Sequence, residues 1–192
     1  MVLLQEKASV DPQLQAVCQE LADNATRALQ LFEGIHSHQL TLRLDPDSWS
    51  IAECVVHLIL FSRAFVPIIQ DACKEGALRS SSPFKMDLLG RIIKFSLEPP
   101  VKLKSVTAHR FEPLVTEPLE EILPTFLELQ NQLVSTVHHA DALDLNAIKV
   151  RSPVSTRVSY NLYSCFEIIS AHQRRHIWQA EIVREQLLAR LL

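Results

Sequence analysis

The sequence predicts an all-α protein in which long amphipathic helices pack into a bundle. Four stretches carry apolar residues at intervals of three and four, the spacing of one helix face, whereas strand signals are few and short. Each such helix must bury its apolar stripe against the others, which favours a bundle. A chain of 192 residues is long enough for one substantial core, so residues 1–192 are expected to form a single domain.

The first helix is expected over residues 11 to about 38. Asp11 is a plausible N-cap and Pro12 follows at the first helical position, where proline is favoured. Gly34, or the region of residues 36–38, is expected to end this helix.

The second helix is expected to begin at Ile51 and to run towards Cys73. Ser50 and Glu53 have the spacing of a capping box just before an apolar run. This helix is apolar on nearly every side, which predicts that much of it is buried. Pro67 lies inside the pattern and should kink the helix or end its first half.

A long irregular segment, residues 76–118, separates the second and third helices. Within it, residues 86–97 predict a short helix that the Glu98-Pro99-Pro100 sequence stops. A connection of this length in a compact domain is usually a functional lid or a crossover with structure of its own.

The third helix is expected over residues 117–142, with Pro124 bending or breaking its first turns. Residues 141–158 then form a loop, in which residues 149–154 can be extended. The fourth helix is expected from Ser159 to about Leu191.

Composition excludes several classes of function. With three glycines in the chain, neither a dinucleotide fingerprint nor a P-loop can be written. A net charge of −3 argues against a nucleic-acid partner, and the mildly basic segment of residues 91–104 is interpreted as solvated surface. No run of 18 apolar residues and no signal-peptide pattern occurs, so we expect a cytoplasmic protein without a membrane partner.

Two histidines of the fourth helix, His172 and His176, lie four residues apart and therefore one turn apart on one face. They continue the apolar stripe of that helix, and His57 stands alone on the apolar second helix. Three neutral imidazoles meeting in the core could bind a transition metal and leave positions open for water, whose pKa the metal would lower. Three separate core histidines, each bonded to a neighbour, explain the pattern equally well.

The remaining histidines and the cysteines are interpreted as structural. The other five histidines are expected at the surface or at helix ends: His36, His38, His109, His138 and His139. The four cysteines form no CxxC and are expected to be buried, reduced thiols: Cys18, Cys54, Cys73 and Cys165. Cys54 and Cys165 alternatively line the cavity near the histidines, and Trp49 and Trp178 are interpreted as packing residues.

Two segments resemble motifs of the DinB-like superfamily, and the resemblance covers essentially the whole chain. Residues 49–58 resemble the W-S-x-x-E-x-x-x-H-L segment that opens the second helix of that superfamily. Residues 172–179 resemble its fourth-helix motif, H-x-x-R-H-I-x-Q. The resemblance implies a four-helix bundle with a long crossover between helices two and three. It also implies a divalent metal ion, nickel or zinc, held by His57, His172 and His176, and a homodimer.

This sequence departs from the commoner family pattern at two places that do not include the ligands. Residues 153–159, before the fourth helix, contain no glycine, and Gln173 stands where relatives often have an acidic residue. The second difference bears on hydrogen bonding behind the metal ligands.

The resemblance implies two leading functions. In the first, the metal activates water or a low-molecular-weight thiol for attack on a small electrophilic substrate, in a hydrolase or a thiol S-transferase with an unidentified general base. In the second, the protein is a stress-related binding or sensor module whose metal is structural or absent. An open coordination position favours the enzyme, and a site closed by Cys54 or Cys165 favours the structural role. A plain interaction bundle fits only if the histidines do not converge.

Overall fold

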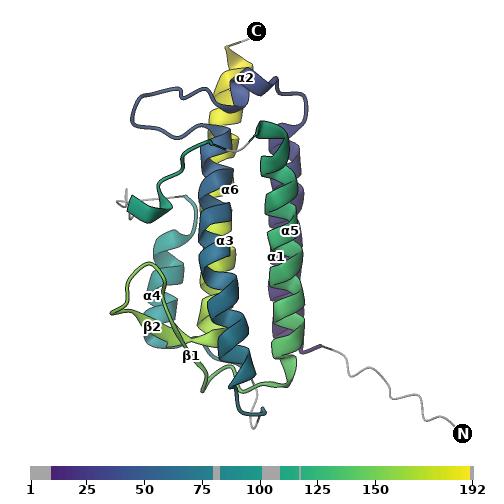
Figure 1. Cartoon of the computed structure of the whole chain (residues 1–192), viewed down its shortest axis with the longest axis vertical. Coiled ribbons are helices and arrows are strands. Elements are labelled where there is room, and N and C mark those ends of the chain that lie inside the picture. Colours follow the sequence, from purple (N-terminus) through teal and green to yellow (C-terminus); the bar gives the residue numbers. More distant parts are fainter. Residues whose placement is uncertain (1–9, 80–82, 101–108, 117, 191–192) are drawn as a thin grey trace, which may run out of the picture.

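The structure is a computed structural model that describes residues 10–79, 83–100, 109–116 and 118–190 (Figure 1). It is mainly α-helical. Four long helices dominate it: α1 (Pro12–Phe32), α3 (Ile51–Lys74), α5 (Leu119–His139) and α6 (Leu162–Ala189). Shorter elements are α2 (Ser37–Leu40), α4 (Leu88–Leu97), η1 (His109–Phe111), η2 (Ala140–Ala142), β1 (Lys149–Arg151) and β2 (Ser159–Asn161).

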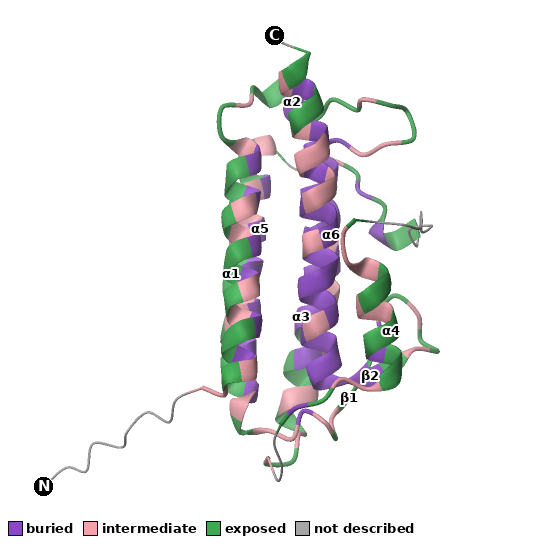
Figure 2. Ribbon diagram, turned by 180° about the vertical axis from the view of Figure 1, so that it is seen from behind, coloured by how far each residue is buried: buried purple, intermediate pink, exposed green. Residues whose placement is uncertain are grey.

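The four long helices pack lengthwise. Both α1 and α3 pack against α5 and against α6, and α4 packs on the outside of α6. Helices α3 and α5 run in the same direction in Figure 1, so the chain between them returns along the outside of the molecule and carries α4 and η1. Figure 2 shows that many residues of α3 and α6 are buried. These two helices supply the histidines.

The predicted helix starts at Asp11 and Ser50 are confirmed. The Asp11 carboxylate accepts a hydrogen bond from the backbone N–H of Gln13, and α1 ends at Phe32, two residues before Gly34, whose φ is +68°. At α3, the Ser50 hydroxyl accepts from the Glu53 backbone N–H while the Glu53 carboxylate accepts from that of Ser50. At the starts of both helices, side chains therefore accept hydrogen bonds from backbone N–H groups that a helix start leaves unpaired.

Neither internal proline ends its helix. Helix α3 continues through Pro67 and α5 continues through Pro124, so of the expected alternatives, a bend or a break, the break is wrong. A proline inside a helix costs about 3 kcal/mol. Apolar side chains on both sides of each proline pack into the core, and their burial outweighs that cost. Helix α3 is also long and apolar enough to cross a membrane, but 72% of its most apolar window is buried inside the fold.

The fourth helix begins later than Ser159, and this correction reveals a small antiparallel sheet. Strand β2 occupies residues 159–161 and pairs with β1, with Val150 opposite Tyr160. Helix α6 then starts at Leu162, where the Asn161 side chain accepts from the Ser164 backbone N–H. The sheet is an addition to the all-α prediction, and residues 149–151 are extended as expected.

The short helix expected over residues 86–97 is confirmed as α4, whose first turn is capped by the Asp87 carboxylate accepting from the Gly90 backbone N–H. Helix α5 begins at Leu119 and ends at His139, where η2 follows. Parts of the irregular segment expected over residues 76–118 lie outside the described residues, namely residues 80–82 and 101–108, which include the end of the basic segment of residues 91–104. The expected start of the third helix, residue 117, also lies outside them.

Candidate metal centre

Three histidines converge between α3 and α6. His57 comes from the second turn of α3, and His172 and His176 come from successive turns of α6. Their exposed fractions are 4%, 7% and 7%, and one ring nitrogen from each lies within 4.8 Å of the others. The ring centroids are 4.4 to 5.0 Å apart. The structure therefore brings together all three residues that the sequence pattern and the family motif singled out.

Hydrogen bonds on the outer side of two rings orient their nitrogens. Nδ1 of His57 lies 2.7 Å from the Phe111 carbonyl oxygen, to which it donates. Nδ1 of His176 donates to the Gln179 side-chain oxygen at 3.2 Å. An Nδ1 that carries the proton leaves Nε2 with a free lone pair, which is the tautomer that a metal ligand requires.

The distance between His57 and His172 suits two ligands of one ion. Their Nε2 atoms are 3.1 Å apart. Two nitrogens bound tetrahedrally at about 2.0–2.1 Å from one metal lie about 3.3 Å from each other. Nδ1 of His172 is buried and has no hydrogen-bond partner among the described residues, so no neighbour selects the tautomer of that ring. The donor set and its spacing fit a divalent ion that prefers imidazole nitrogen.

Burial keeps the three imidazoles neutral. Loss of solvent is the largest cause that lowers the pKa of His57, and it lowers the pKa values of His172 and His176 well below the usual range. The neighbouring histidines and the Arg175 guanidinium lower the pKa values of His172 and His176 further. Neutral imidazole is the form that binds metal.

Aromatic side chains pack around the three histidines. Phe61 stacks on His172 with ring centroids 3.9 Å apart, and Trp49 lies 4.9 Å from His57 and 5.4 Å from His176. Trp49 is thus a packing residue, as expected, but it packs on the site itself. Phe61 follows His57 by four residues, a spacing from which its position could have been inferred.

Within the described residues, no cysteine or carboxylate joins the three histidines. Cys54 and Cys165 are fully buried in the two apolar clusters, and burial raises the pKa of each thiol. The described part of the chain therefore offers three candidate ligands, which is the number typical of catalytic sites that keep a position for water or substrate.

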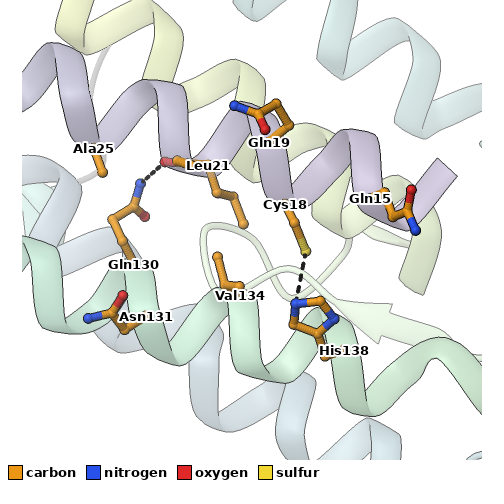
Figure 3. A pocket seen from close by; sticks show the side chains of 10 residues that line it. Gln15, Cys18, Gln19, Leu21, Ala25, Gln130, Asn131, Val134 and His138 are labelled. Atoms are coloured by element: carbon orange, nitrogen blue, oxygen red, sulfur yellow. Dashed lines mark hydrogen bonds between the residues drawn. The ribbon is translucent and has the colours of Figure 1, made fainter. Parts of the chain in front are cut away.

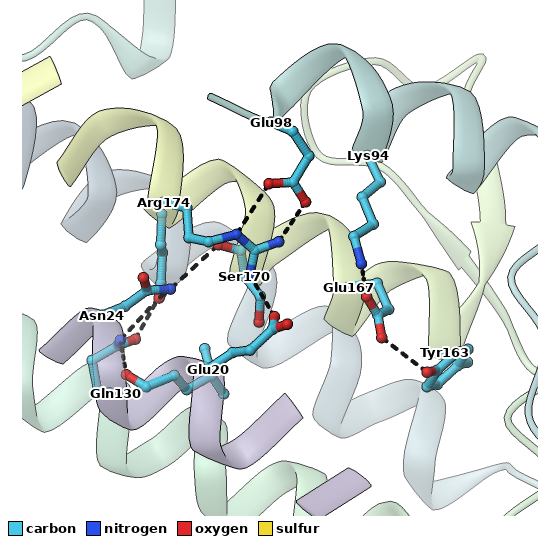
Figure 4. Close-up of polar contacts among 11 residues, drawn as sticks. Glu20, Asn24, Lys94, Glu98, Gln130, Tyr163, Glu167, Ser170 and Arg174 are labelled. Carbon is cyan, nitrogen blue, oxygen red and sulfur yellow. Dashed lines mark hydrogen bonds and ion pairs between the residues drawn. The ribbon is translucent and has the colours of Figure 1, made fainter. Parts of the chain in front are cut away.

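Gln173 does not support the metal ligands. Its side chain turns towards α1 and α5, where its oxygen accepts from the amides of Asn24 and Gln130 and its own amide donates back to Gln130 at 2.6 Å. Figure 4 shows Asn24 and Gln130 in this buried amide cluster. Gln173, which stands where relatives often have an acidic residue, thus links α6 to α1 and α5 and makes no hydrogen bond to the three histidines.

The two arginines between His172 and His176 hold the end of α4. The Arg174 guanidinium pairs with the Glu98 carboxylate just after α4 and with Glu20 of α1 (Figure 4). Nη1 of Arg175 donates to the Ser96 carbonyl oxygen at 3.2 Å. With the Phe111 carbonyl on His57, these contacts attach the chain between α3 and α5 to the histidine centre at several points.

A second polar site lies in a groove between α1 and α5. The Cys18 sulfur is 3.9 Å from Nε2 of the exposed His138, and amide side chains line the groove around them (Figure 3). Cys18 and Cys73 are only half-buried, unlike Cys54 and Cys165, and all four are free thiols. The expectation of fully buried cysteines therefore holds for two of the four.

A family model of the DinB superfamily matches residues 20–180. The chain belongs to the DinB superfamily. The match includes His57, His172 and His176, so the convergence of these side chains and the family assignment agree. Comparisons with curated proteins and with solved structures gave no significant match.

Proposed function

We propose that this DinB-superfamily chain is a metal-dependent enzyme in which His57, His172 and His176 hold one divalent ion, nickel or zinc. The observation that carries the proposal is the convergence of three buried, neutral imidazoles without a fourth protein ligand among the described residues. Family membership supports it.

The chemistry follows from the donor set. A divalent ion held by these three neutral imidazoles would lower the pKa of a water or thiol and so supply a nucleophile near neutral pH. Hydrogen bonds hold the imidazoles of His57 and His176 in the ligating tautomer, and Trp49 and Phe61 exclude bulk water from the rings. Arg175 adds positive charge close to the histidines, which favours an anionic nucleophile such as hydroxide or thiolate. We infer a hydrolase or a thiol S-transferase that acts on a small electrophile, with a low-molecular-weight thiol as the second substrate in the latter case.

The proposal also covers the fold, the oligomeric state and the location of the protein. We propose that the four long helices form the four-helix bundle of the superfamily, with residues 75–118 as its crossover and residues 1–192 as one domain. The direction of α3 and α5 supports this arrangement. We further propose a cytoplasmic homodimer.

Metal content tests the site. Purified protein is expected to carry about one divalent ion per chain by elemental analysis, and His57→Ala should lose most of it. His138→Ala is the matched control, because His138 is exposed and lies in the α1–α5 groove. If His57→Ala kept the metal content and affinity of the unmodified protein, the three-histidine assignment would be wrong.

A non-catalytic metal-binding module is the second candidate, and the burial of the centre favours it. The three histidines each expose at most 7% of their surface, so little of the centre is open to solvent. A screen of thiols with electrophilic acceptors, and of esters and amides, separates the two functions. Turnover that disappears with the metal supports the enzyme, whereas full metal occupancy without turnover across the screen supports the binding module.

A further inference from the structure

Helix α4 presents an apolar stripe that nothing in the described chain covers. Leu88, Ile92 and Phe95 recur at intervals of four and three and so share one face, with Leu89 at its edge. Their exposed fractions are 66%, 57%, 80% and, for Leu89, 39%. These four residues, here called the α4 stripe, include four of the nine large apolar side chains that are exposed in the described part of the chain. Figure 2 shows the exposed face of α4 turned away from the long helices.

The opposite face of α4 is locked, so the helix cannot turn the stripe inwards. Ile93 and Leu97 pack against the core, and a Cβ added to Gly90 would lie 2.3 Å from the Ser164 hydroxyl oxygen. Ser164 also donates to the Asp87 carboxylate that caps α4. The exposure is therefore a fixed property of the fold.

The charges beside the stripe are of both signs and include the exposed Arg91. Three ion pairs tie α4 and its flanks to the rest of the chain: Lys94 with Glu167, Glu98 with Arg174, and Asp87 with Lys149. An anionic membrane surface selects a dense basic rim instead. A second copy of this chain carries the same apolar stripe and the same balanced rim, which is what a self-complementary two-fold contact requires.

The size of the stripe agrees with such a contact. Its four side chains present an apolar patch on the order of 400 Å², and patches of that size on monomers are commonly binding surfaces. A two-fold contact buries the patch twice, on the order of 800 Å² before the rim is counted, and specific interfaces bury about 1,200–2,000 Å². The rim residues of α4 and its neighbours would have to supply the difference.

We propose that the α4 stripe is the contact surface of a two-fold homodimer of this chain. The proposal locates the interface of the homodimer proposed above and does not depend on metal binding. Because α4 packs on α6 and its end is held by Arg174 and Arg175, the interface lies behind the helix that carries two of the three histidines.

Light scattering coupled to size-exclusion chromatography tests the proposal. The unmodified protein is expected to elute as a dimer at micromolar concentrations. The Phe95→Glu variant is expected to elute as a monomer, because its dimer dissociation constant should be at least tenfold larger. Leu114→Glu is the matched control, because Leu114 is 73% exposed and lies outside the stripe, and it should remain dimeric.

Two further measurements keep the outcome decisive. Circular dichroism should show the same helix content for Phe95→Glu as for the unmodified protein, and Ile92→Glu should repeat the loss of the dimer. A dimer that survives both substitutions, or an unmodified protein that is monomeric, overturns the proposal. Metal content measured on the same samples separates this failure from a failure of the metal site.

Discussion

Acidification should destabilise the metal-free protein through its buried histidines. Burial lowers the pKa values of His57, His172 and His176 in the folded state, whereas in the unfolded chain each is about 6.5. Below pH 6.5 the unfolded state therefore binds more protons than the folded state, and the free energy of unfolding falls as the pH falls. The stability that the neutral rings contribute is fully present well above pH 6.5.

The magnitude follows from proton linkage. For one histidine that stays neutral in the fold, lowering the pH from 6.5 to 5.5 costs about 1 kcal/mol. His172 and His176, whose pKa values are well below the usual range, should each contribute this amount, and His57 a smaller one. The sum of about 2–3 kcal/mol corresponds to a fall in melting temperature of roughly 4–12 °C for a domain of this size. Glu53 and Asp87, whose pKa values are lowered, lose their contribution only at more acidic pH.

The assay is thermal unfolding followed by circular dichroism at pH 7.5, 6.5 and 5.5, after removal of metal with a chelator. A variant with all three histidines changed to glutamine is the control, and its melting temperature should change far less over this range. Bound zinc or nickel should also suppress the change down to the pH at which protons displace the metal. An equal slope in the glutamine variant would refute the reasoning, because the pH dependence would then come from other groups.

Two further predictions concern the packing around the centre. Gly90→Ala should destabilise the protein by about 1–3 kcal/mol in chemical unfolding, because the new Cβ meets the Ser164 hydroxyl and pushes α4 off α6; unchanged stability would mean that α4 is loosely held. Gln173→Leu should cost about 1–3 kcal/mol by leaving the Gln130 side-chain oxygen without its donor. Adding Gln130→Leu should recover part of that loss, and a strictly additive double variant would show that the two amides are not coupled.

Local patterns were enough to place most helices. The cap at Asp11, the capping box of Ser50 and Glu53, and the short helix before Glu98 all depend on residues within one turn of each other. The β1–β2 sheet escaped prediction because three-residue strands carry too little periodicity to be distinguished from a loop. The sequence left open whether Pro67 bends or ends its helix, because the local cost of proline is visible in the sequence but the burial that outweighs it is not.

The three histidines of the candidate site were predicted from the sequence, but most of their surroundings were not. Spacing placed His172 and His176 on one buried face, and the family motif added His57. The Phe111 carbonyl, which orients His57, is a backbone atom 54 residues away along the chain, so no side-chain pattern could reveal it. The direction of Gln173, away from the histidines and towards Gln130, likewise depends on how three helices meet.

The sequence by itself determined which helices form and which nitrogens are available to a metal, because helix periodicity and capping act within a few residues. Only the tertiary structure decided that His57 and His172, 115 residues apart, bring their Nε2 atoms to 3.1 Å, and that no buried thiol joins them among the described residues. It also decided which apolar stripe is left exposed. In the sequence, the apolar spacing of α4 is the same as that of a helix face that packs into a core. Phe95 lies at the surface because the opposite face of α4 packs on α6.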